Sequence, residues 1–407
     1  MKKILLLTAL MAGAMTVNAQ SDFKVKELAK LPVTEISGYD GGSCRSAYGF
    51  NDKLYLVDRA AKQLRVFNIL TKEEVGQVEI GANNAMGHDE AGNAIIGNWG
   101  WAATAVKPST TFTLISADLT KKVTTNETTC VRGRTDLLGK AKGNVFGAEG
   151  ATLLAAGILE DVTTGFASYT FSGGDEPTVE YNNVSEYLEA GDTPTIVAGS
   201  SSLVFNYFKD LDGTDHYLYV NRSLPIIDFT FDDGTVSSIT KYDPEDRITR
   251  LGVNNGADIF VLGNRKFMVY PHSTTDTEKN LPKYRDGFSI VEINDDNTLT
   301  QVFRQESTLK VGEIGSQINW LWVEVLNEKQ AKLYQYFRDG YAAEYGIAIN
   351  GADTPTGVTG IENAAAKAVS TTYYTPAGVA SKTAVKGLNI VVTKYADGSQ
   401  KVVKVIK

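Results

Sequence analysis

Short segments of alternating hydrophobic and polar residues, separated by Gly, Asn and Asp, run through most of the chain. Alternation with a period of two residues is typical of β-strands that bury one face. The clearest case is "LRVFNILTKEEVGQVEI", residues 64–80, where two alternating strands flank a polar turn. Long segments with the 3.6-residue period of an amphipathic helix are absent from the sequence. The pattern therefore predicts an all-β protein.

This strand–turn–strand pattern recurs at intervals of about 50 to 60 residues. The residues that open the turns are Asn68, Ala117, Ser172, Asp232, Asn294 and Asn350. A repeat of this length holds four strands, and each such sheet has an apolar face that only a neighbouring repeat can cover. If the repeats are arranged in a ring around a central axis, only short strand edges are exposed. We therefore predict a β-propeller over residues 20–350. Six blades are favoured, with five or seven blades, or a pair of β-sandwiches, as alternatives.

Three further segments complete the domain organisation. The alternating segment "DFKVKELAKL", residues 22–31, is predicted to supply the outer strand that closes the last blade. Residues 351–372 are rich in Thr, Gly, Pro and other small residues, which indicates a linker. Residues 373–407 are predicted to form a small β-module that ends in a hairpin with an Asp397-Gly398 turn.

The first 19 residues have the pattern of a signal peptide. Lys2 and Lys3 precede the apolar segment "ILLLTALMAGAM", which is too short to span a bilayer. Val17-Asn18-Ala19 then provides a cleavage site before Gln20. No later segment reaches the roughly 20 apolar residues of a spanning helix. We expect an exported, soluble protein in the periplasm, on the cell surface or outside the cell.

The body and the tail of this chain differ in charge. Residues 373–407 contain six lysines and one acidic residue, a net charge of +5. From residue 20 to the tail, 32 basic residues stand against 47 acidic ones, a net charge of −15. A body this acidic repels nucleic acid and anionic lipid, so we expect neither as a partner.

The tail has motifs in a recognisable order. Tyr374 with Gly378 is followed by Lys386-Gly387-Leu388-Asn389-Ile390-Val391, by Asp397-Gly398 and by a last strand from Val402 to Lys407. This order resembles the C-terminal sorting domains of proteins linked to type IX secretion, and "TGIENA" at residue 359 resembles their usual lead-in. Asn389 stands where an aromatic residue is usual, and Thr375-Pro376-Ala377 replaces the commoner turn.

The resemblance covers about a tenth of the chain. It implies delivery across the outer membrane by the secretion machinery and says nothing about activity. The alternative is an ordinary small β-module. The body resembles, in architecture more than in motif, secreted β-propeller proteins of unknown activity that carry such tails.

Cys44 and Cys130 are the two cysteines of the chain. Export permits a disulfide between them, which in the chain-entropy model would stabilise the fold by roughly 4–5 kcal/mol. Two buried free thiols are the alternative. The spacing fits neither a CxxC pair nor a zinc site.

Motifs of known catalytic sites are missing from the sequence. There is no GxSxG, HExxH or GxGxxG motif, and the catalytic residues, if there are any, stay unknown. The segment 133–140, "GRTDLLGK", has the wrong glycine spacing for a phosphate loop. The segment "DLDGTD", with Asp210, Asp212 and Asp215, lacks the glutamate of a calcium loop and is better interpreted as a hairpin turn. We therefore expect neither a metal site nor a cofactor.

Two groups of residues are candidates for a binding site. Trp99 and Trp101 lie two residues apart, as do Trp320 and Trp322, so each pair shares one face if it lies on a strand. Paired indoles suit stacking on sugar rings; the alternative is that they pack between adjacent blades. The first pair has glycines beside it and follows His88-Asp89, which opens a hairpin and could face a pore mouth. An exposed turn histidine is the alternative for His88.

Three functions are compatible with these observations. The first is a secreted or cell-surface binding protein for a glycan or protein ligand, in which Trp99, Trp101, His88 and Asp89 would contribute to the site. The second is a propeller hydrolase or lyase that acts on sugars or lactones with a divalent metal held by inward carboxylates or amides. The third is a structural component of a surface assembly.

Overall fold

The fold was analysed in a computed structural model. It describes residues 22–406 except for residues 41–43, 45, 82–84, 98–108, 127, 130–137, 157–164, 173–175, 188–203, 221–225, 245–255, 277–280, 308–318, 339, 356–367, 376–377 and 396–399. The chain divides into two compact units, Met1–Gly357 and Val358–Lys407. Each unit is described by itself below.

The first half of the larger unit contains three four-stranded antiparallel sheets built from consecutive strands. Sheet 1 has the order β2 (Ala47–Phe50), β3 (Lys53–Asp58), β4 (Gln63–Asn68), β5 (Glu74–Glu79). Sheet 2 has the order β6 (Ala85–His88), β7 (Ala94–Gly97), β9 (Phe112–Ile115), β10 (Lys122–Thr124), and β8 (Ser109–Thr110) pairs separately with β11 (Thr128–Thr129). Sheet 3 has the order β12 (Lys142–Gly143), β13 (Ala151–Ala156), β14 (Gly165–Phe171), β15 (Thr178–Asn183).

The second half repeats this plan in three more sheets. Sheet 4 has the order β16 (Val204–Lys209), β17 (Asp215–Val220), β18 (Ile226–Asp232), β19 (Thr235–Tyr242). Sheet 5 has the order β20 (Asp258–Leu262), β21 (Arg265–Asp276), β22 (Leu281–Ile293), β23 (Leu299–Gln305). Sheet 6 has the order β24 (Asn319–Asn327), β25 (Gln330–Phe337), β26 (Tyr341–Ile349), β1 (Phe23–Pro32). In the described residues, helical structure is limited to the short 3-10 turns η2 (Val33–Glu35) and η3 (Ser185–Tyr187).

The all-β prediction is confirmed, and five of the repeated hairpins are the third and fourth strands of sheets 1 to 5. The sixth differs because the strand that pairs with β26 on its outer side does not come from the chain after Asn350. Its partner is β1, which pairs with β26 from Phe23–Ile349 to Pro32–Tyr341, with a bulge between Glu27 and Ala29. The prediction that the N-terminal segment supplies this outer strand is confirmed.

The burial pattern explains why the third and fourth strands differ in polarity. Strands in the middle of a sheet, such as β3 and β26, are buried on both faces because a sheet lies on each side of them. The outer strand β5 alternates between exposed and half-buried positions. An apolar strand followed by an alternating one is therefore the pattern of an inner strand and an outer strand in a stack of sheets.

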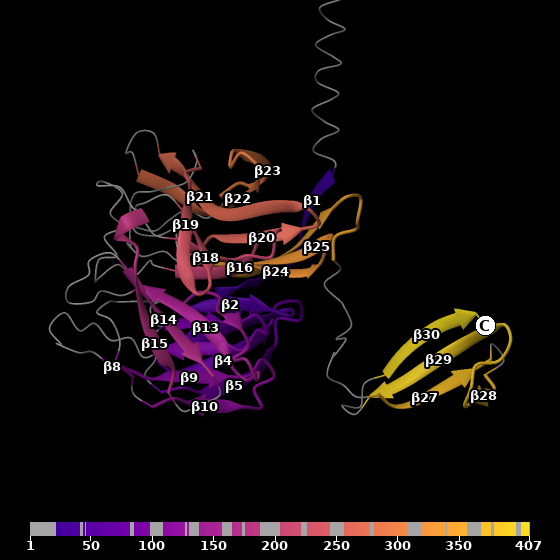
Figure 1. The fold of residues 1–407 in the computed structure, drawn as a ribbon. Helices are drawn as coiled ribbons and strands as arrows, with labels where there is room; N and C mark the ends of the chain where they lie inside the picture. The colour runs from indigo at the N-terminus through magenta and orange to yellow at the C-terminus, as the bar shows by residue number, and fades with distance from the viewer. Residues whose placement is uncertain are drawn as a thin grey trace, which may run out of the picture. The chain divides into compact units, whose positions relative to one another are not determined.

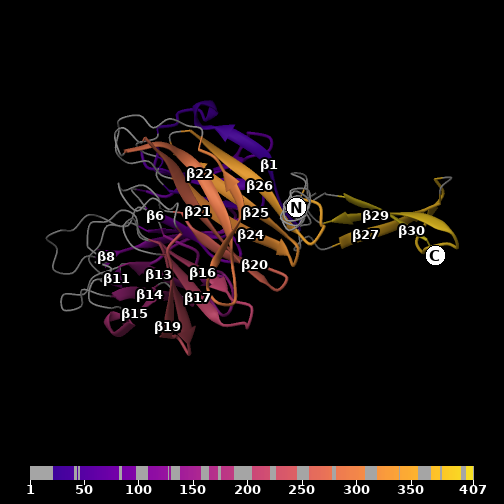
Figure 2. The same ribbon diagram turned by 90° about the horizontal axis from the view of Figure 1, so that it is seen from above.

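The sheets pack face to face, and their first strands meet one another. β2 contacts β6 and β24, while β16 contacts β13 and β20, and β20 contacts β24 (Figures 1 and 2). Apolar clusters fill the space between neighbouring sheets, for example Phe166 with Phe229 between sheets 3 and 4. This is a propeller-like arrangement.

Glycines allow this close approach of the first strands. A Cβ on Gly139 would lie 1.8 Å from the carbonyl oxygen of Phe205 in sheet 4. A Cβ on Gly87 would lie 2.2 Å from the carbonyl oxygen of Gly139 itself. The three segments can therefore pack backbone against backbone only because both positions lack a side chain.

The smaller unit is a separate four-stranded sheet. Its order is β28 (Ala380–Ser381), β27 (Ala368–Tyr374), β29 (Leu388–Tyr395), β30 (Gln400–Ile406). β27 begins at Ala368, inside the segment 351–372 that the composition indicated as linker. Asn389 is fully buried; its side chain accepts the Val385 N–H at 2.8 Å and donates to the carbonyls of Val385 and Gly387. The residue that departs from the tail pattern thus closes the loop before β29.

In the described part of the chain, no helix has the length and apolarity to cross a membrane.

Candidate functional site

His88 and Asp89 are buried, with exposed fractions of 5% and 0%. The alternative interpretation of His88 as an exposed turn residue is therefore wrong. His88 ends β6, and its ring stacks on Tyr48 of sheet 1 at a centroid distance of 4.6 Å. Burial, reinforced by the Lys140 ammonium, lowers the pKa of His88 to about 3. The imidazole is therefore neutral at physiological pH.

Asp89 organises the turn between β6 and β7. Its carboxylate accepts the backbone N–H groups of Ala91 and Asn93 and, across the sheet boundary, that of Val145 at 2.8 Å. Burial raises its pKa, and these hydrogen bonds oppose the rise. All of its acceptor capacity is used within the protein, so its role is to join sheets 2 and 3.

Of the two tryptophan pairs, only Trp320 and Trp322 lie among the described residues. Trp99 and Trp101 lie outside the described residues, so their place in a carbohydrate site stays a prediction. Gly97 is the last described residue before them. It pairs with Ala85 at the open end of the β6–β7 hairpin, whereas Asp89 lies in the turn that closes the other end. Trp320 and Trp322 are buried in β24 with centroids 6.1 Å apart, and the prediction that they pack in the core is confirmed.

The two cysteines also differ. Cys44 is a buried free thiol, and burial raises its pKa to about 12, so it is neither in a disulfide nor a reactive thiolate. Cys130 lies outside the described residues.

A cleft of about 740 Å³ opens at the strand turns of sheets 4 and 5. Three turns line it: residues 210–212 after β16, residues 264–266 between β20 and β21, and residues 292–298 between β22 and β23. The turn after β16 is the segment that resembles a calcium loop. It is a tight hairpin turn in which Asp210 accepts the Gly213 N–H through its backbone carbonyl, which confirms the hairpin interpretation.

Two cations of the cleft are already paired. Arg265 donates through Nε and Nη2 to the Glu292 carboxylate, at 2.7 and 2.6 Å, and through Nη1 to Asp22 at 3.1 Å. Lys266 forms an ion pair of 2.7 Å with Asp210. These pairs link sheets 4, 5 and 6 at one end of the body.

Three acids of the cleft have no cationic partner among the described residues: Asp212, Asp295 and Asp296. Asp212 accepts the hydroxyl and the backbone N–H of Thr214, and Asp296 accepts the same two groups of Thr298. These hydrogen bonds hold the pKa of each carboxyl below its ordinary value. The cleft therefore carries uncompensated negative charge at neutral pH.

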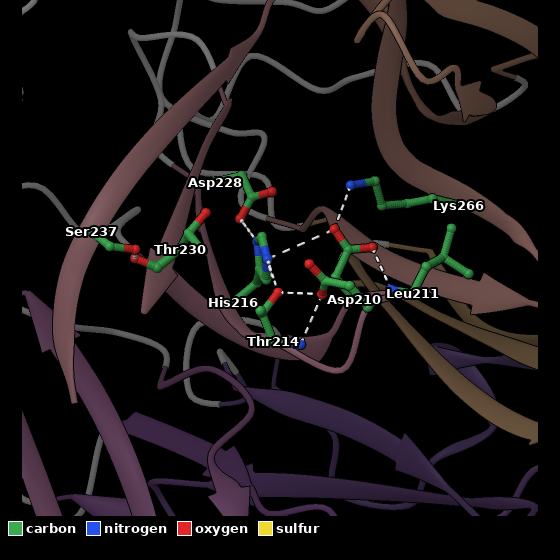
Figure 3. A network of polar contacts seen from close by, with 9 residues as sticks. Asp210, Leu211, Thr214, His216, Asp228, Thr230, Ser237 and Lys266 are labelled. Carbon is green, nitrogen blue, oxygen red and sulfur yellow. Dashed lines mark hydrogen bonds and ion pairs between the residues drawn. The ribbon is translucent and has the colours of Figure 1, made fainter. Parts of the chain in front are cut away.

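A buried polar network supports the first of these turns (Figure 3). His216 on β17 contacts Asp228 on β18 through Nδ1 at 2.8 Å and Thr214 through Nε2 at 2.8 Å. Asp210 lies 3.7 Å from the same Nε2 and bridges to Lys266. Burial raises the pKa of Asp228, and its contact with His216 opposes this rise. The network fixes the turn between two sheets before any ligand arrives.

The order of Asp228, His216 and Thr214 resembles a catalytic triad, but the hydrogen bonds run in the wrong direction. A nucleophilic hydroxyl must donate to the histidine. Here the Thr214 hydroxyl donates to Asp212 at 2.6 Å, so its contact with His216 is one in which the hydroxyl accepts. The arrangement orders the turn and does not activate Thr214.

A second polar group lies where the first strands meet. Asn206 on β16 accepts the Lys140 N–H at 3.0 Å and donates to the Ala257 carbonyl at 2.7 Å. Asp258 at the start of β20 accepts the Val323 N–H at 2.9 Å. Glu324 on β24 accepts the Asn51 N–H at 2.9 Å. Each of these side chains joins its own sheet to the next.

The described residues contain no group of three or more His, Cys, Asp or Glu side chains arranged to hold a metal ion. Sequence reasoning named neither the cleft nor the polar group at the first strands. The only sequence signal for the cleft was a group of Asp and Asn residues in turns. This signal is weak, because turns of any β-protein are rich in these residues.

No family model matches this sequence, and no curated protein matches it either. Among solved structures, the chain is similar to a DUF4623 family protein from Bacteroides eggerthii, with a TM-score of 0.51 and 9% identity over 81% of this chain and 76% of that one. A likeness at this identity concerns the fold alone. A subtype N10 neuraminidase-like protein of a little yellow-shouldered bat influenza virus gives a TM-score of 0.44 at 9% identity, covering 81% of this chain and 100% of that one. The β-propeller domain of Cps50 (Swd1) from Myceliophteria thermophila gives 0.39 at 7% identity, covering 94% and 100%.

Proposed function

We propose that this protein is an exported, non-catalytic binding protein built on a six-bladed propeller, and that its acidic cleft takes a cationic segment of a protein ligand. The observation that carries the proposal is the cleft of about 740 Å³, with three carboxylates that no cation of the described residues neutralises. Its size lies within the range of ligand-binding pockets.

The contacts around the body support six blades. Sheets 1 to 6 succeed one another in the chain, and the Asp89–Val145 and Asn206–Ala257 hydrogen bonds join neighbouring sheets. Sheet 6 returns to sheet 1 through Glu324–Asn51 and through Lys332, which pairs with Asp52. Apolar clusters likewise connect sheet 6 to sheet 5 and to sheet 1.

The chemistry of the cleft favours binding over catalysis. The cations of the cleft are paired with Glu292, Asp210 and Asp22. Beside the cleft, the Thr214 hydroxyl donates to Asp212 and so does not donate to His216, as a nucleophile would have to do. A lysine or arginine side chain of a partner would meet Asp212, Asp295 and Asp296 together. Because the turns are already fixed by internal hydrogen bonds, little ordering entropy is lost on binding.

The proposed location rests on the sequence. The signal-peptide pattern of residues 1–19 favours export, and the tail motifs favour delivery by type IX secretion. That residues 358–407 form a compact unit of their own agrees with a tail that acts in sorting and takes no part in ligand binding.

The test uses a hexalysine peptide as the probe, titrated into the full chain at low salt. Replacing the three acids together (Asp212→Asn, Asp295→Asn, Asp296→Asn) should weaken binding roughly tenfold, because exposed charge pairs contribute up to about 1 kcal/mol each. Hexaglutamate should not bind to either form.

The matched control removes the same charge elsewhere. Glu73, Glu79 and Glu149 are exposed acids on sheets 1 and 3, and their joint replacement by Gln should leave hexalysine binding within about twofold of the parent. Equal weakening in both triple variants would mean diffuse attraction by an acidic surface, and the cleft would then not be the site.

A further inference from the structure

The hydrogen bonds of the polar network beside the cleft determine where its protons lie (Figure 3). Nδ1 of His216 lies 2.8 Å from a carboxylate oxygen of Asp228, and Nε2 lies 2.8 Å from the Thr214 hydroxyl. That hydroxyl has a single hydrogen, which it donates to Asp212 at 2.6 Å. Toward His216 the hydroxyl can therefore only accept, so Nε2 must carry a hydrogen.

The contact between His216 and Asp228 requires a hydrogen as well. A ring nitrogen and a carboxylate oxygen at 2.8 Å would repel each other if both presented lone pairs. An imidazole is more basic than a carboxyl group, so the hydrogen belongs on Nδ1. The contact with His216 also opposes the burial that raises the pKa of Asp228, as expected of a carboxylate that accepts. With hydrogens on both nitrogens, the ring is a charged imidazolium.

The charged groups that face the ring agree with an imidazolium. Asp228 on β18 contacts one nitrogen, and Asp210 lies 3.7 Å from the other. Lys266 of sheet 5 pairs with Asp210 at 2.7 Å. Burial and the charges of Asp228 and Asp210 raise the pKa of Tyr242 on β19, so its phenol is neutral. Two largely buried carboxylates thus stand against one ammonium, and a charged His216 balances them.

We propose that His216 is a positioning residue of the cleft and that it sets the charge of the cleft through Thr214. When the ring is charged, the Thr214 hydroxyl stays on Asp212. When Nε2 loses its proton to solvent, this nitrogen becomes an acceptor, and the hydroxyl turns from Asp212 to donate to it. The Nδ1 hydrogen stays, because Asp228 accepts it. Loss of one proton therefore removes a positive charge beside the cleft and frees an acceptor site on Asp212.

The Asp212 carboxylate is where this change reaches a ligand. It is exposed and lines the cleft. The hydroxyl and the N–H of Thr214 lower its pKa, with a smaller contribution from the charge of His216. After the hydroxyl turns, the Thr214 N–H still donates to Asp212 at 2.9 Å, so the turn keeps its shape. The proton positions do not depend on the proposed function; only the effect on cation binding rests on it.

The first experiment is NMR of the isotope-labelled full chain from about pH 5.5 to 8.5, the range in which histidines usually titrate. We expect both ring nitrogens of His216 to carry hydrogens at the acid end and only Nδ1 to carry one at the alkaline end. The carboxyl carbon of Asp212 should shift in step with this change. His88 provides an internal reference, because burial lowers its pKa to about 3 and its ring stays neutral throughout.

Thr214→Val tests the relay, because valine keeps the branched shape and lacks the hydroxyl. In this variant the carboxyl carbon of Asp212 should no longer follow His216. The matched control is Thr298→Val, since Thr298 lies in a turn of the same kind and its hydroxyl donates to Asp296 at 2.6 Å. In the control, Asp212 should follow His216 as it does in the parent. Thermal melts show whether both variants are folded.

The second experiment measures hexalysine binding over the same pH range at low salt. Binding to the parent should become roughly three- to fivefold tighter once Nε2 has lost its proton, because one cation beside the cleft is removed. Lysine side chains stay charged over this range. His216→Gln has no titrating group at this position, and its amide can still donate to Asp228, so its binding should not change with pH.

Three results would overturn the proposal. The first is a His216 ring that is neutral at both ends of the range or that keeps its last hydrogen on Nε2. The second is an Asp212 signal that ignores His216, or that follows it equally in Thr214→Val. The third is the same pH dependence of hexalysine binding in the parent and in His216→Gln. If hexalysine binds at no pH, the proposed function fails, whereas the NMR data still confirm or overturn the action of His216 on Asp212.

Discussion

Individual side chains in this protein take their chemistry from burial more than from residue type. His88 and Asp89 are adjacent in the sequence, yet the first stacks as a neutral ring on Tyr48 and the second accepts backbone N–H groups from two sheets. Burial shifts their pKa values in opposite directions, down for the histidine and up for the carboxyl, because it disfavours the charged form of each. Neither residue is available to solvent as a ligand-binding group.

The lowered pKa of His88 predicts a loss of stability in acid. The unfolded chain takes up a proton near pH 6.5, whereas the folded protein does so only near pH 3. The contribution is therefore fully present above pH 6.5 and is lost as the pH falls toward 3. Between pH 7.5 and pH 5, the free energy of unfolding should fall by about 2 kcal/mol on account of this residue.

Urea denaturation of the parent and of His88→Phe at both pH values measures this contribution. Phenylalanine keeps an aromatic ring against Tyr48 and cannot be protonated, so the variant should lack about 2 kcal/mol of the acid sensitivity. The comparison between the two proteins cancels the titration of all other groups. If both lose the same free energy, His88 is protonated in the folded protein and the assignment is wrong.

Among the elements, β1 holds a special place because it joins the two ends of the body. It pairs with β26 over its whole length, and Phe23 packs in the cluster shared by sheets 5 and 6. Asp22 adds an ion pair to Arg265, and Lys30 lies 3.7 Å over the ring of Tyr341. Without β1, β26 would become an exposed edge strand, which promotes association with other chains.

Deletion of residues 22–32 together with the preceding segment should therefore lower the melting temperature of the body by roughly 10 °C, through loss of buried side chains and of a strand pair. The deleted form should also self-associate. The matched control lacks only residues 1–21 and should melt as the full chain does. A β1-deleted form that stays monomeric with an unchanged melting temperature would contradict the closing role of this strand. Differential scanning calorimetry and light scattering give both readouts.

The whole molecule consists of two compact units. The larger one contains sheets 1 to 6, and the smaller one contains the single sheet β28-β27-β29-β30. The five apolar clusters found in the described residues all lie in the larger unit. We therefore expect the larger unit to keep its structure when the smaller one is removed.

A chain truncated after Pro355 tests this division. We expect the melting temperature of its body to stay within about 2 °C of that of the full chain, with β-type circular dichroism. Cell fractionation should show the full chain at the surface and the truncated chain retained. Loss of the cooperative melt would show that the body needs the tail, and equal surface exposure of both forms would remove the sorting role.

The sequence by itself predicted the all-β class, the recurring strand–turn–strand pairs and the role of the N-terminal segment as an outer strand. These follow from local alternation and from a repeat of about 50 to 60 residues, and both are read directly along the chain. It also separated the body from the tail, since composition changes near residue 351. The core position of Trp320 and Trp322 was one of two alternatives, and an apolar pattern on both faces of the strand favoured it.

Only the tertiary structure decided which polar residues act together. Asp210, Lys266 and Glu292 lie at three turns of two sheets, and Lys140 and Asn206, which hydrogen-bond to each other, are 66 residues apart. In the sequence each is an ordinary turn or strand residue. Packing of one sheet against the next brings them together, and it depends on close contacts such as Gly139 against Phe205, which local alternation does not encode.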